Sequence, residues 1–573
     1  MEHRPSLTRG WNLVLACALL PLTACQPRVE PASLVVTNAR VVTVDEAMAE
    51  AQAVAVRGDR IVELGTRDAI QRYVGPSTEV IDAGGRLVIP GLIESHGHFT
   101  GVGEAQLVLK LATAKTWDDI LAMVENAAKT AKPGQWIYGR GWHQEKWTAP
   151  PTPNVEGFPT EASLSRVSPN NPVLLTHASG HASFANALAM KLSGISATTR
   201  SPEGGEILKD AKGNPTGLLR ETAARLIKPG LGEPEPTAEE RLARDNRVLE
   251  LAAEESLSKG ITSFQDAGSS FETVDRMRAM ADEGKLGVRL WVMIRATIEQ
   301  YSQKLAQYKT VDHASGFLTV RGIKQSIDGA LGSRGAWLLE PYSDKPDSTG
   351  LNTTPVDDIR AVAKLAVQHG YQLCVHAIGD RANRETLNIF AEAFKANPDK
   401  KDLRWRVEHA QHLNPSDIPR FGALGVIASM QGVHCTSDAP YVLARLGPKR
   451  AEEGAYVWQK LMKSGAVVTN GTDAPVEDVD PIASYYASVS RKLKDGSVFY
   501  PDQRMSRMEA LKSYTINGAF AAFEENSKGS LKAGKYADMV ILSKDIMTIP
   551  EDEIPSAQVL YTIVGGKVRY KRL

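Results

Sequence analysis

The sequence predicts an α/β protein built on a (β/α)8 TIM barrel. A large insertion is expected after the first strand, and both termini are expected to form one small β-sandwich domain. Three observations lead to this fold: short apolar segments alternate with helix-patterned ones through the middle of the chain, one long stretch interrupts that alternation, and both ends are strand-rich. An open, doubly wound parallel sheet is the competing architecture.

Eight short apolar segments are the expected barrel strands. The first is VIPGLIESHGHF, and the others occupy residues 260–268, 288–295, 318–329, 371–380, 403–411, 425–431 and 465–475. Segments such as DDIRAVAKLAVQHG, with apolar residues at helical spacing, lie between most of them. A strand followed by a helix, repeated to eight strands, matches the strand count of a barrel.

The remaining regions break this pattern in two ways. Residues 104–245, approximately, separate the first two strands and are far too long for a connecting loop, so we expect an inserted subdomain on the active-site side. Residues 33–90 and 528–573 are β-rich and punctuated by turn residues, which indicates a composite sandwich domain. This division leaves 91–527 for the barrel and its insertion.

The first 25 residues have the layout of an export signal. Arg4 and Arg9 precede an apolar run that is too short to span a bilayer and that ends in LTAC. This ending resembles a bacterial lipobox, which implies cleavage before Cys25 and acylation of its thiol; a soluble exported protein and an uncleaved anchor are the alternatives. Gln26, by resemblance to sorted lipoproteins, favours the periplasmic face of the outer membrane. Residues 26–32 would form a tether.

Composition excludes some partners. The formal net charge is zero, so no basic surplus favours nucleic-acid binding, and no later segment is apolar for long enough to cross a membrane. Two cysteines remain beyond the signal and the lipid site. An exported protein could pair Cys374 with Cys435, but Cys374 lies in an apolar strand pattern, which favours a buried free thiol.

Polar side chains gather at the C-terminal ends of the expected strands, where barrel enzymes place their active sites. They are His96, His98, Lys324, His376, His409 and Asp473. Each has an ordinary alternative: a core histidine for His376, a snorkelling lysine, a pair of His409 with Glu408, or a helix N-cap for Asp473. Their common position at the ends of five strands favours a joint function instead.

The chemistry of these residue types points to a metal site. Imidazole nitrogen suits zinc, and a catalytic zinc keeps one position open for water. Two metals about 4 Å apart need a bridging anion, which a carbamylated lysine supplies through the two oxygens of its N-carboxylate. An aspartate beside a metal-activated hydroxide can both bind the metal and carry a proton.

These motifs resemble the amidohydrolase superfamily, in particular the amidohydrolase 3 branch that contains N-substituted formamide deformylase. The matching segments are ESHGHF, IKQSIDGALGSRGAW, HAIGDRA, RVEHAQ, GTDAPVEDVDP, GSLKAGKYADMVIL and, within the insertion, SGHASFANALAM. Glu94 stands where the branch usually has aspartate, and Gly432 stands where proline is common. Neither position removes an expected ligand.

The resemblance implies a role for each residue at the strand ends. His96 and His98 would bind a first metal, and His376 and His409 a second. Lys324 would be the carboxylated bridge, and Asp473 a further ligand and the general base. His181, Asp328, Arg334 and His434 are candidates for substrate contact, although Asp328 and Arg334 could instead form a salt bridge that stabilises a loop.

The expected protein is a lipid-anchored hydrolase that uses one or two divalent ions, such as Zn²⁺. It would cleave the C–N bond of a small amide or formamide-like substrate. The same site could instead act on a cyclic amide, a carbamate or an ester, because loops rather than folds choose substrates. A surface-tethered binding or regulatory lipoprotein without turnover is an alternative of another class. The sequence leaves open whether the chain forms a homo-oligomer.

Overall fold

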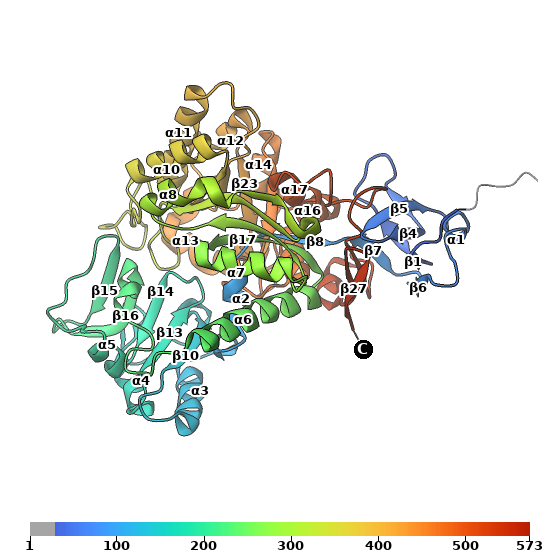
Figure 1. Cartoon of the computed structure of the whole chain (residues 1–573). Helices are drawn as coiled ribbons and strands as arrows, with labels where there is room; N and C mark the ends of the chain where they lie inside the picture. Colours follow the sequence, from blue (N-terminus) through green and yellow to red (C-terminus); the bar gives the residue numbers. More distant parts are fainter. Residues whose placement is uncertain (1–28, 573) are drawn as a thin grey trace, which may run out of the picture.

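The computed structural model describes residues 29–572, and the expected export signal and Cys25 lie outside this range. Figure 1 shows a central barrel with a strand-rich domain on either side, one formed by residues after the first barrel strand and one formed by both ends of the chain.

Eight parallel strands form the barrel in chain order: β8 (Leu92–Gly97), β17 (Ile261–Ser269), β18 (Arg289–Ile294), β20 (Leu318–Ser326), β21 (Gln372–Ala377), β22 (Arg406–His409), β23 (Ile427–Gln431) and β24 (Val468–Gly471). β19 (Thr310–Asp312) pairs antiparallel with β20. The end of β24 lies beside β8, where Asp473 N donates to His96 O at 2.8 Å. The barrel predicted from the sequence is therefore confirmed, and the open sheet is not what forms.

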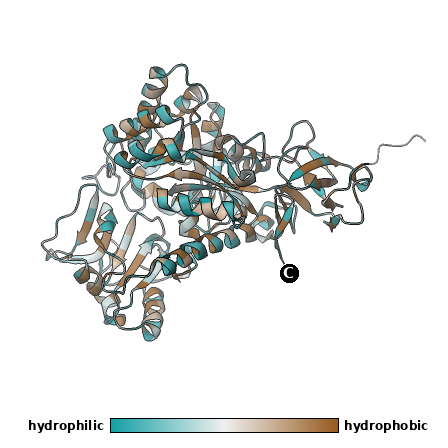
Figure 2. Cartoon of the chain, in the orientation of Figure 1, coloured by the Kyte–Doolittle hydropathy of each residue, from teal (hydrophilic) through white to brown (hydrophobic). Residues whose placement is uncertain are grey.

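Helices cover the outside of the barrel. They are α2 (Phe99–Ala105), α6 (Ala238–Ser258), α7 (Phe271–Asp282), α8 (Ile298–Tyr308), α10 (Val356–His369), α11 (Asp380–Ala396), α12 (Ile418–Leu424), α13 (Gly432–Gly454), α14 (Trp458–Lys463), α15 (Pro481–Ser490), α16 (Arg507–Ser513) and α17 (Ile516–Ala521). Every residue of β18 and β21 is buried, as expected for parallel strands packed on both faces. Figure 2 shows hydrophobic residues in the strands and mixed faces on the helices around them.

A second sheet forms the inserted domain, in the order β15 (Gly205–Lys209), β16 (Pro215–Glu221), β14 (Ala182–Ala185), β13 (Val173–His177), β10 (Ile137–Trp142) and β9 (Leu109–Lys110). Also in this domain are β11 (Asn154–Val155), β12 (Phe158–Pro159), α3 (Trp117–Thr130), α4 (Glu161–Val167) and α5 (Ala187–Leu192). The domain has its own core around Trp117, Trp142 and Phe184. The expected end of the insertion near residue 245 falls inside α6, because Thr237 starts that helix earlier through a capping box with Glu240.

Both termini build the third domain from two sheets. One has the order β5 (Arg60–Gly65), β4 (Ala53–Arg57), β1 (Leu34–Thr37) and β6 (Glu79–Asp82), with α1 (Arg67–Gln71) following β5. The other has the order β27 (Lys567–Lys571), β26 (Val559–Val564), β25 (Met539–Leu542), β7 (Leu87–Pro90), β2 (Arg40–Val42) and β3 (Glu50–Ala51). Val36 and Val54 from one end share a core with Ile541 and Ile563 from the other.

Two smaller expectations concern cysteine and membrane insertion. Cys374 and Cys435 are both buried and free, as the apolar pattern around Cys374 indicates. Within residues 29–572, none of the helices combines the length and apolar character needed to cross a bilayer.

Candidate metal centre

All six residues expected as ligands meet at one mouth of the barrel. His96 lies on β8, Lys324 on β20, His376 on β21 and His409 on β22, while His98 directly follows β8 and Asp473 lies two residues beyond β24. Asp473 Oδ1 lies 3.2 Å from His98 Nε2 and 3.5 Å from His96 Nε2. Lys324 Nζ lies 3.2 Å from His96 Nε2, so these four side chains form one continuous group.

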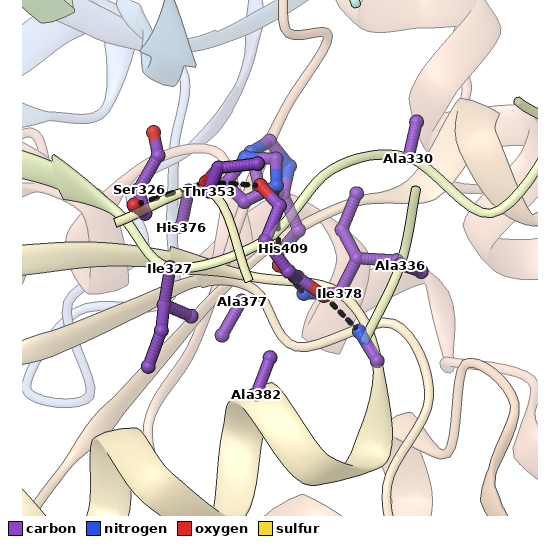
Figure 3. Close-up of polar contacts among 12 residues, drawn as sticks. Ser326, Ile327, Ala330, Ala336, Thr353, His376, Ala377, Ile378, Ala382 and His409 are labelled. Atoms are coloured by element: carbon purple, nitrogen blue, oxygen red, sulfur yellow. Dashed lines mark hydrogen bonds and ion pairs between the residues drawn. The ribbon is translucent and has the colours of Figure 1, made fainter. Parts of the chain in front are cut away.

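The other two imidazoles extend this group across the mouth. The ring centroid of His409 lies 4.6 Å from that of His96 and 4.5 Å from that of His376. His409 Nδ1 lies 3.9 Å from Asp473 Oδ2. Figure 3 shows His376 and His409 side by side, near Ser326 and Thr353. Asp473 is therefore the side chain that both sets of histidines approach.

The backbone is shaped to present two of these side chains. His409 and Asp473 both have positive φ angles, 78° and 56°, a backbone conformation that costs energy and persists only when the surrounding contacts hold it. Glu94 braces the turn before Asp473, because Thr472 N donates to its Oε1 at 2.7 Å and Thr472 Oγ1 to its Oε2 at 3.1 Å. A Cβ at Gly471 would lie 2.4 Å from Glu94 Oε1, so the glycine is required there.

Glu408 orients His96 from below. Its Oε2 accepts a hydrogen bond from His96 Nδ1, which leaves His96 Nε2 facing the centre. Arg406 completes this arrangement, with its Nε 2.7 Å from Glu408 Oε1 and its Nη1 donating to Gln265 Oε1 at 2.6 Å. Such partners fix the tautomer and the orientation of a metal-binding imidazole.

The suggested pairing of His409 with Glu408 is not found. Adjacent residues of a strand point to opposite faces, so Glu408 and His409 cannot face each other. His409 Nδ1 instead donates to Gln431 Oε1 at 2.8 Å, which leaves its Nε2 free.

Protonation states in the cluster suit metal binding, which requires neutral imidazole and ionised carboxylate. Burial, followed by the nearby Lys324 charge, lowers the pKa of His96 to about 4, and burial also holds the pKa values of His376 and His409 well below the usual range. Burial alone would raise the pKa of Asp473, but the close imidazoles of His98 and His96 hold it well below the ordinary value.

Unpaired polar atoms show that the cluster fits a cation. His376 Nε2, His434 Nε2 and Asp473 Oδ1 are buried and accept or donate no hydrogen bond within the described chain. Each such atom costs about 1–3 kcal/mol unless something binds it. Ligand atoms lie within 4.8 Å of one another in two groups, His96 with His98 and Asp473, and His409 with His434 and Asp473. Nitrogen and carboxylate donors in this arrangement suit one or two divalent ions such as zinc.

The four second-tier residues have different positions. Asp328 is fully buried and accepts backbone hydrogen bonds from Trp337, Ile378 and Gly379 at 2.8–3.0 Å, so it anchors the loops around His376. The suggested Asp328–Arg334 salt bridge does not form, because Arg334 instead pairs with Asp344 at 3.1 Å.

His181 and His434 approach the cluster from opposite sides. His181 reaches in from the inserted domain, with its ring centroid 5.1 Å from that of His376 and its Nδ1 2.8 Å from Glu221 Oε2. Burial acts to lower the pKa of His181, but the Glu221 carboxylate outweighs it and raises that pKa. His434 lies on α13, with its Nδ1 3.0 Å from Gln411 Nε2 and its ring 6.4 Å from His409.

A cleft of about 1350 Å³ opens over the cluster between the barrel and the inserted domain. His98, His181, Lys324, His376, His409 and Asp473 all line it. A smaller cavity of about 50 Å³ adjoins the same ligands and is lined also by His143, His434 and Glu477. The cleft wall includes Arg225 and Arg295, two residues that sequence reasoning missed because they belong to no recognisable spacing pattern.

Known proteins are similar to this chain over nearly its whole length. The model of the amidohydrolase family matches residues 79–570. Protein LONG AFTER FAR-RED 3 of Arabidopsis thaliana is 34% identical over 552 residues, covering 94% of this chain and 92% of that protein. N-substituted formamide deformylase of Arthrobacter pascens is 29% identical over 548 residues, covering 94% and 98%. A solved structure of an uncharacterized metal-dependent hydrolase from Pyrococcus furiosus is 26% identical, with a TM-score of 0.68 over 90% of this chain and 100% of that one.

Proposed function

This chain belongs to the amidohydrolase family and is a metal-dependent hydrolase, and on that premise we propose that it cleaves the C–N bond of an amide or formamide-like small molecule. The observation that carries the proposal is the convergence of four imidazoles, a lysine and an ionised aspartate at the barrel mouth, with buried unpaired atoms among them. The likeness to N-substituted formamide deformylase supports this bond type.

The proposed metal ligands divide into two sets around Asp473. His96 and His98 would hold one ion, and His376 and His409 a second, with the position of His434 allowing it to assist the latter set. When bound, divalent ions supply a Lewis acid that polarises a carbonyl and lowers the pKa of water from about 15.7 to near 7.

Asp473 is the proposed general base. Its carboxylate is ionised, the residue lines the cleft, and its Oδ1 lies close to the imidazoles of His96 and His98, so it can take the proton from an attacking water. The same carboxyl group would then return that proton to the departing nitrogen. Burial lowers the pKa values of His96 and His409, so these two imidazoles are neutral and are not the expected proton donors.

Lys324 is the proposed bridging carbamate. Burial, opposed by the Glu408 charge, lowers the pKa of its ammonium group to about 8, which increases the neutral amine that reacts with carbon dioxide. Its Nζ lies 3.2 Å from His96 Nε2, at the centre of the cluster. His181 and His434, which border the centre, are the proposed substrate contacts.

We also propose export and lipid anchoring at Cys25, with the hydrolase held at the periplasmic face of the outer membrane. This proposal rests on the basic and apolar layout of the first 25 residues, on the LTAC ending and on Gln26. Cys25→Ser should abolish labelling by radioactive palmitate and release the protein from membranes; unchanged labelling would contradict acylation at this residue.

A hydrolysis panel with one common amine tests the proposed reaction. Zinc-loaded protein would be given the formamide, the acetamide and the carbamate of 2-phenylethylamine, and the formate ester of 2-phenylethanol. Amide cleavage that Asp473→Asn abolishes would support the proposal. Turnover of the ester or carbamate alone would favour those alternatives. A folded, metal-loaded protein without turnover on any member would oppose the proposed C–N chemistry.

A further inference from the structure

Arg225 and Arg295 line the cleft with exposed side chains and have no carboxylate partner within the described chain. Arg295 follows β18, and its Nη2 donates to Ser326 Oγ at 3.2 Å. Arg225 lies in a short 3-10 helix of the inserted domain, η3 (Thr222–Leu226), and makes no side-chain hydrogen bond or ion pair within residues 29–572. Lys228, one turn further along, also lines the cleft.

Other arginines of the same cleft are already engaged. Arg140 donates to Pro475 O and Ala178 O, both at 3.3 Å. Arg241 donates to Pro236 O at 2.6 Å, and Arg244 lies 3.9 Å from Glu104. Arg225 differs from these residues in making neither a hydrogen bond nor an ion pair within the described chain, and Arg295 differs from them in lying next to Lys324.

Arg295 lies beside the candidate metal centre. A Cβ placed on Gly268 would be 3.2 Å from Arg295 Cβ and 3.5 Å from Lys324 Cγ, so the stems of the two side chains run close together. Ser326, which holds the guanidinium, is two residues beyond Lys324 on β20 and therefore shares its face of the strand. Figure 3 shows Ser326 and Thr353 close to His376.

Arg225 and Arg295 place two like charges on the wall of one cleft. The Arg295 side chain is exposed to the cleft, yet the surrounding protein lowers its pKa by partial desolvation; Tyr301 opposes this shift, and the positive charge of Arg225 adds to it. Arginine remains charged in proteins, so the two like charges persist in the cleft. A bound anion would offset this repulsion, and the planar guanidinium matches the two oxygens of a carboxylate.

We infer that Arg225 and Arg295 bind a carboxylate of the substrate, so that the amides hydrolysed are those of N-acyl amino acids. The inference rests on the proposed amide hydrolysis and adds the substrate class. The scissile amide would lie at the metal centre while its carboxylate contacts the cleft wall beside Lys324. Because the two arginines come from different domains, substrate would also link the inserted domain to the barrel.

A matched pair of substrates tests this inference. N-formylphenylalanine, as either enantiomer, carries the carboxylate, and N-(2-phenylethyl)formamide is the same amide without it. We expect the wild-type protein to prefer the carboxylate substrate. Arg295→Gln and Arg225→Gln should each raise the KM for the carboxylate substrate by about 10–100-fold, which corresponds to the loss of one charge-assisted contact. The KM for the neutral amide should change by less than about threefold. Arg241→Gln removes the same charge from the cleft and should leave the preference intact.

A binding measurement separates this inference from the proposed reaction. 3-Phenylpropanoate would be titrated into wild-type protein and both arginine variants, where any metal contact is common to all three. Weaker binding in the variants supports carboxylate recognition even if neither formamide is cleaved, in which case only the proposed reaction fails. Equal binding in all three proteins overturns the inference, and so does wild-type cleavage of the neutral amide that is as efficient as cleavage of N-formylphenylalanine. Either result leaves the proposed amide hydrolysis intact.

Discussion

The two ends of the barrel each contain a buried arginine paired with a carboxylate, and the pairs differ in what they leave open. At the floor, Arg289 Nε donates to Asp538 Oδ2 at 2.8 Å and its Nη1 to Ser315 O at 2.7 Å, while Gly565 N binds Asp538 Oδ1 at 2.8 Å. The guanidinium also stacks on Tyr536, 3.7 Å from its ring centroid. The hydrogen bonds of this pair are all made within the floor, where the pair joins the barrel to the terminal domain.

At the mouth, the Arg406–Glu408 pair is equally buried, but Glu408 also binds His96 Nδ1. The Glu408 carboxylate therefore influences the candidate metal centre through the imidazole of His96. The comparison indicates that burial of an ion pair does not mark function by itself. The distinguishing feature at the mouth is that the Glu408 carboxylate accepts a hydrogen bond that orients His96, and the other ring nitrogen of His96 remains free to bind a metal.

Asp473→Asn should have the largest effect on turnover. The amide cannot take a proton, so we expect kcat to fall by about 10²–10⁴-fold or more, since the residue is also a proposed ligand. Thermal unfolding should change little, because Asp473 Oδ1 makes no hydrogen bond in the fold. Near-normal kcat in this variant would remove Asp473 as the base.

Lys324→Ala should remove both metal and activity if the lysine carries the bridging carbamate. Short carboxylic acids such as acetate or propionate should restore part of the activity, because they supply the missing oxygens. Metal content per chain, measured with and without the acid, checks this outcome. A variant that retains its full metal content would rule out the bridge.

Glu408→Gln should weaken the site without dismantling it. The loss of the anion that orients His96 is expected to reduce metal affinity or activity by about 10–100-fold. Competition with a chelator measures the affinity directly. If affinity and kcat both stay at the wild-type level, the distinction drawn between mouth and floor is unsupported.

Asp538→Asn should have the smallest effect on turnover and a clear effect on stability. It breaks a buried ion pair, which costs about 3 kcal/mol, so the unfolding midpoint should fall while metal content and kcat stay near wild type. Scanning calorimetry and an activity assay on the same preparation test this. Lost turnover in a still-folded variant would mean that the floor pair also serves the site.

Much of the fold follows from patterns that are local in sequence. Each expected barrel segment coincides with one of the eight strands, and only β17 extends beyond its segment, by one residue, because parallel strands buried on both faces are continuous apolar runs bounded by turns. The six polar residues at strand ends are brought together for the same reason: barrel geometry converts equivalent positions on different strands into neighbours.

The remaining features depend on contacts that no spacing records. Glu408 and His409 are adjacent in sequence, yet they face opposite sides and bind His96 and Gln431 respectively. Arg334 is close to Asp328 along the chain but pairs with Asp344. Arg225 and Arg295 line the same cleft only because the inserted domain packs over the barrel mouth, a placement that its own sequence does not encode locally.

Zinc titration of chelator-treated protein, with bound metal and amide hydrolysis measured on the same sample, tests the central claim most directly. The account predicts that activity rises with bound zinc and saturates at one or two ions per chain, and that Asp473→Asn stays inactive at the same occupancy. Hydrolysis by folded protein that contains no metal, or zinc bound without any dependence on His96 and His409, would contradict it.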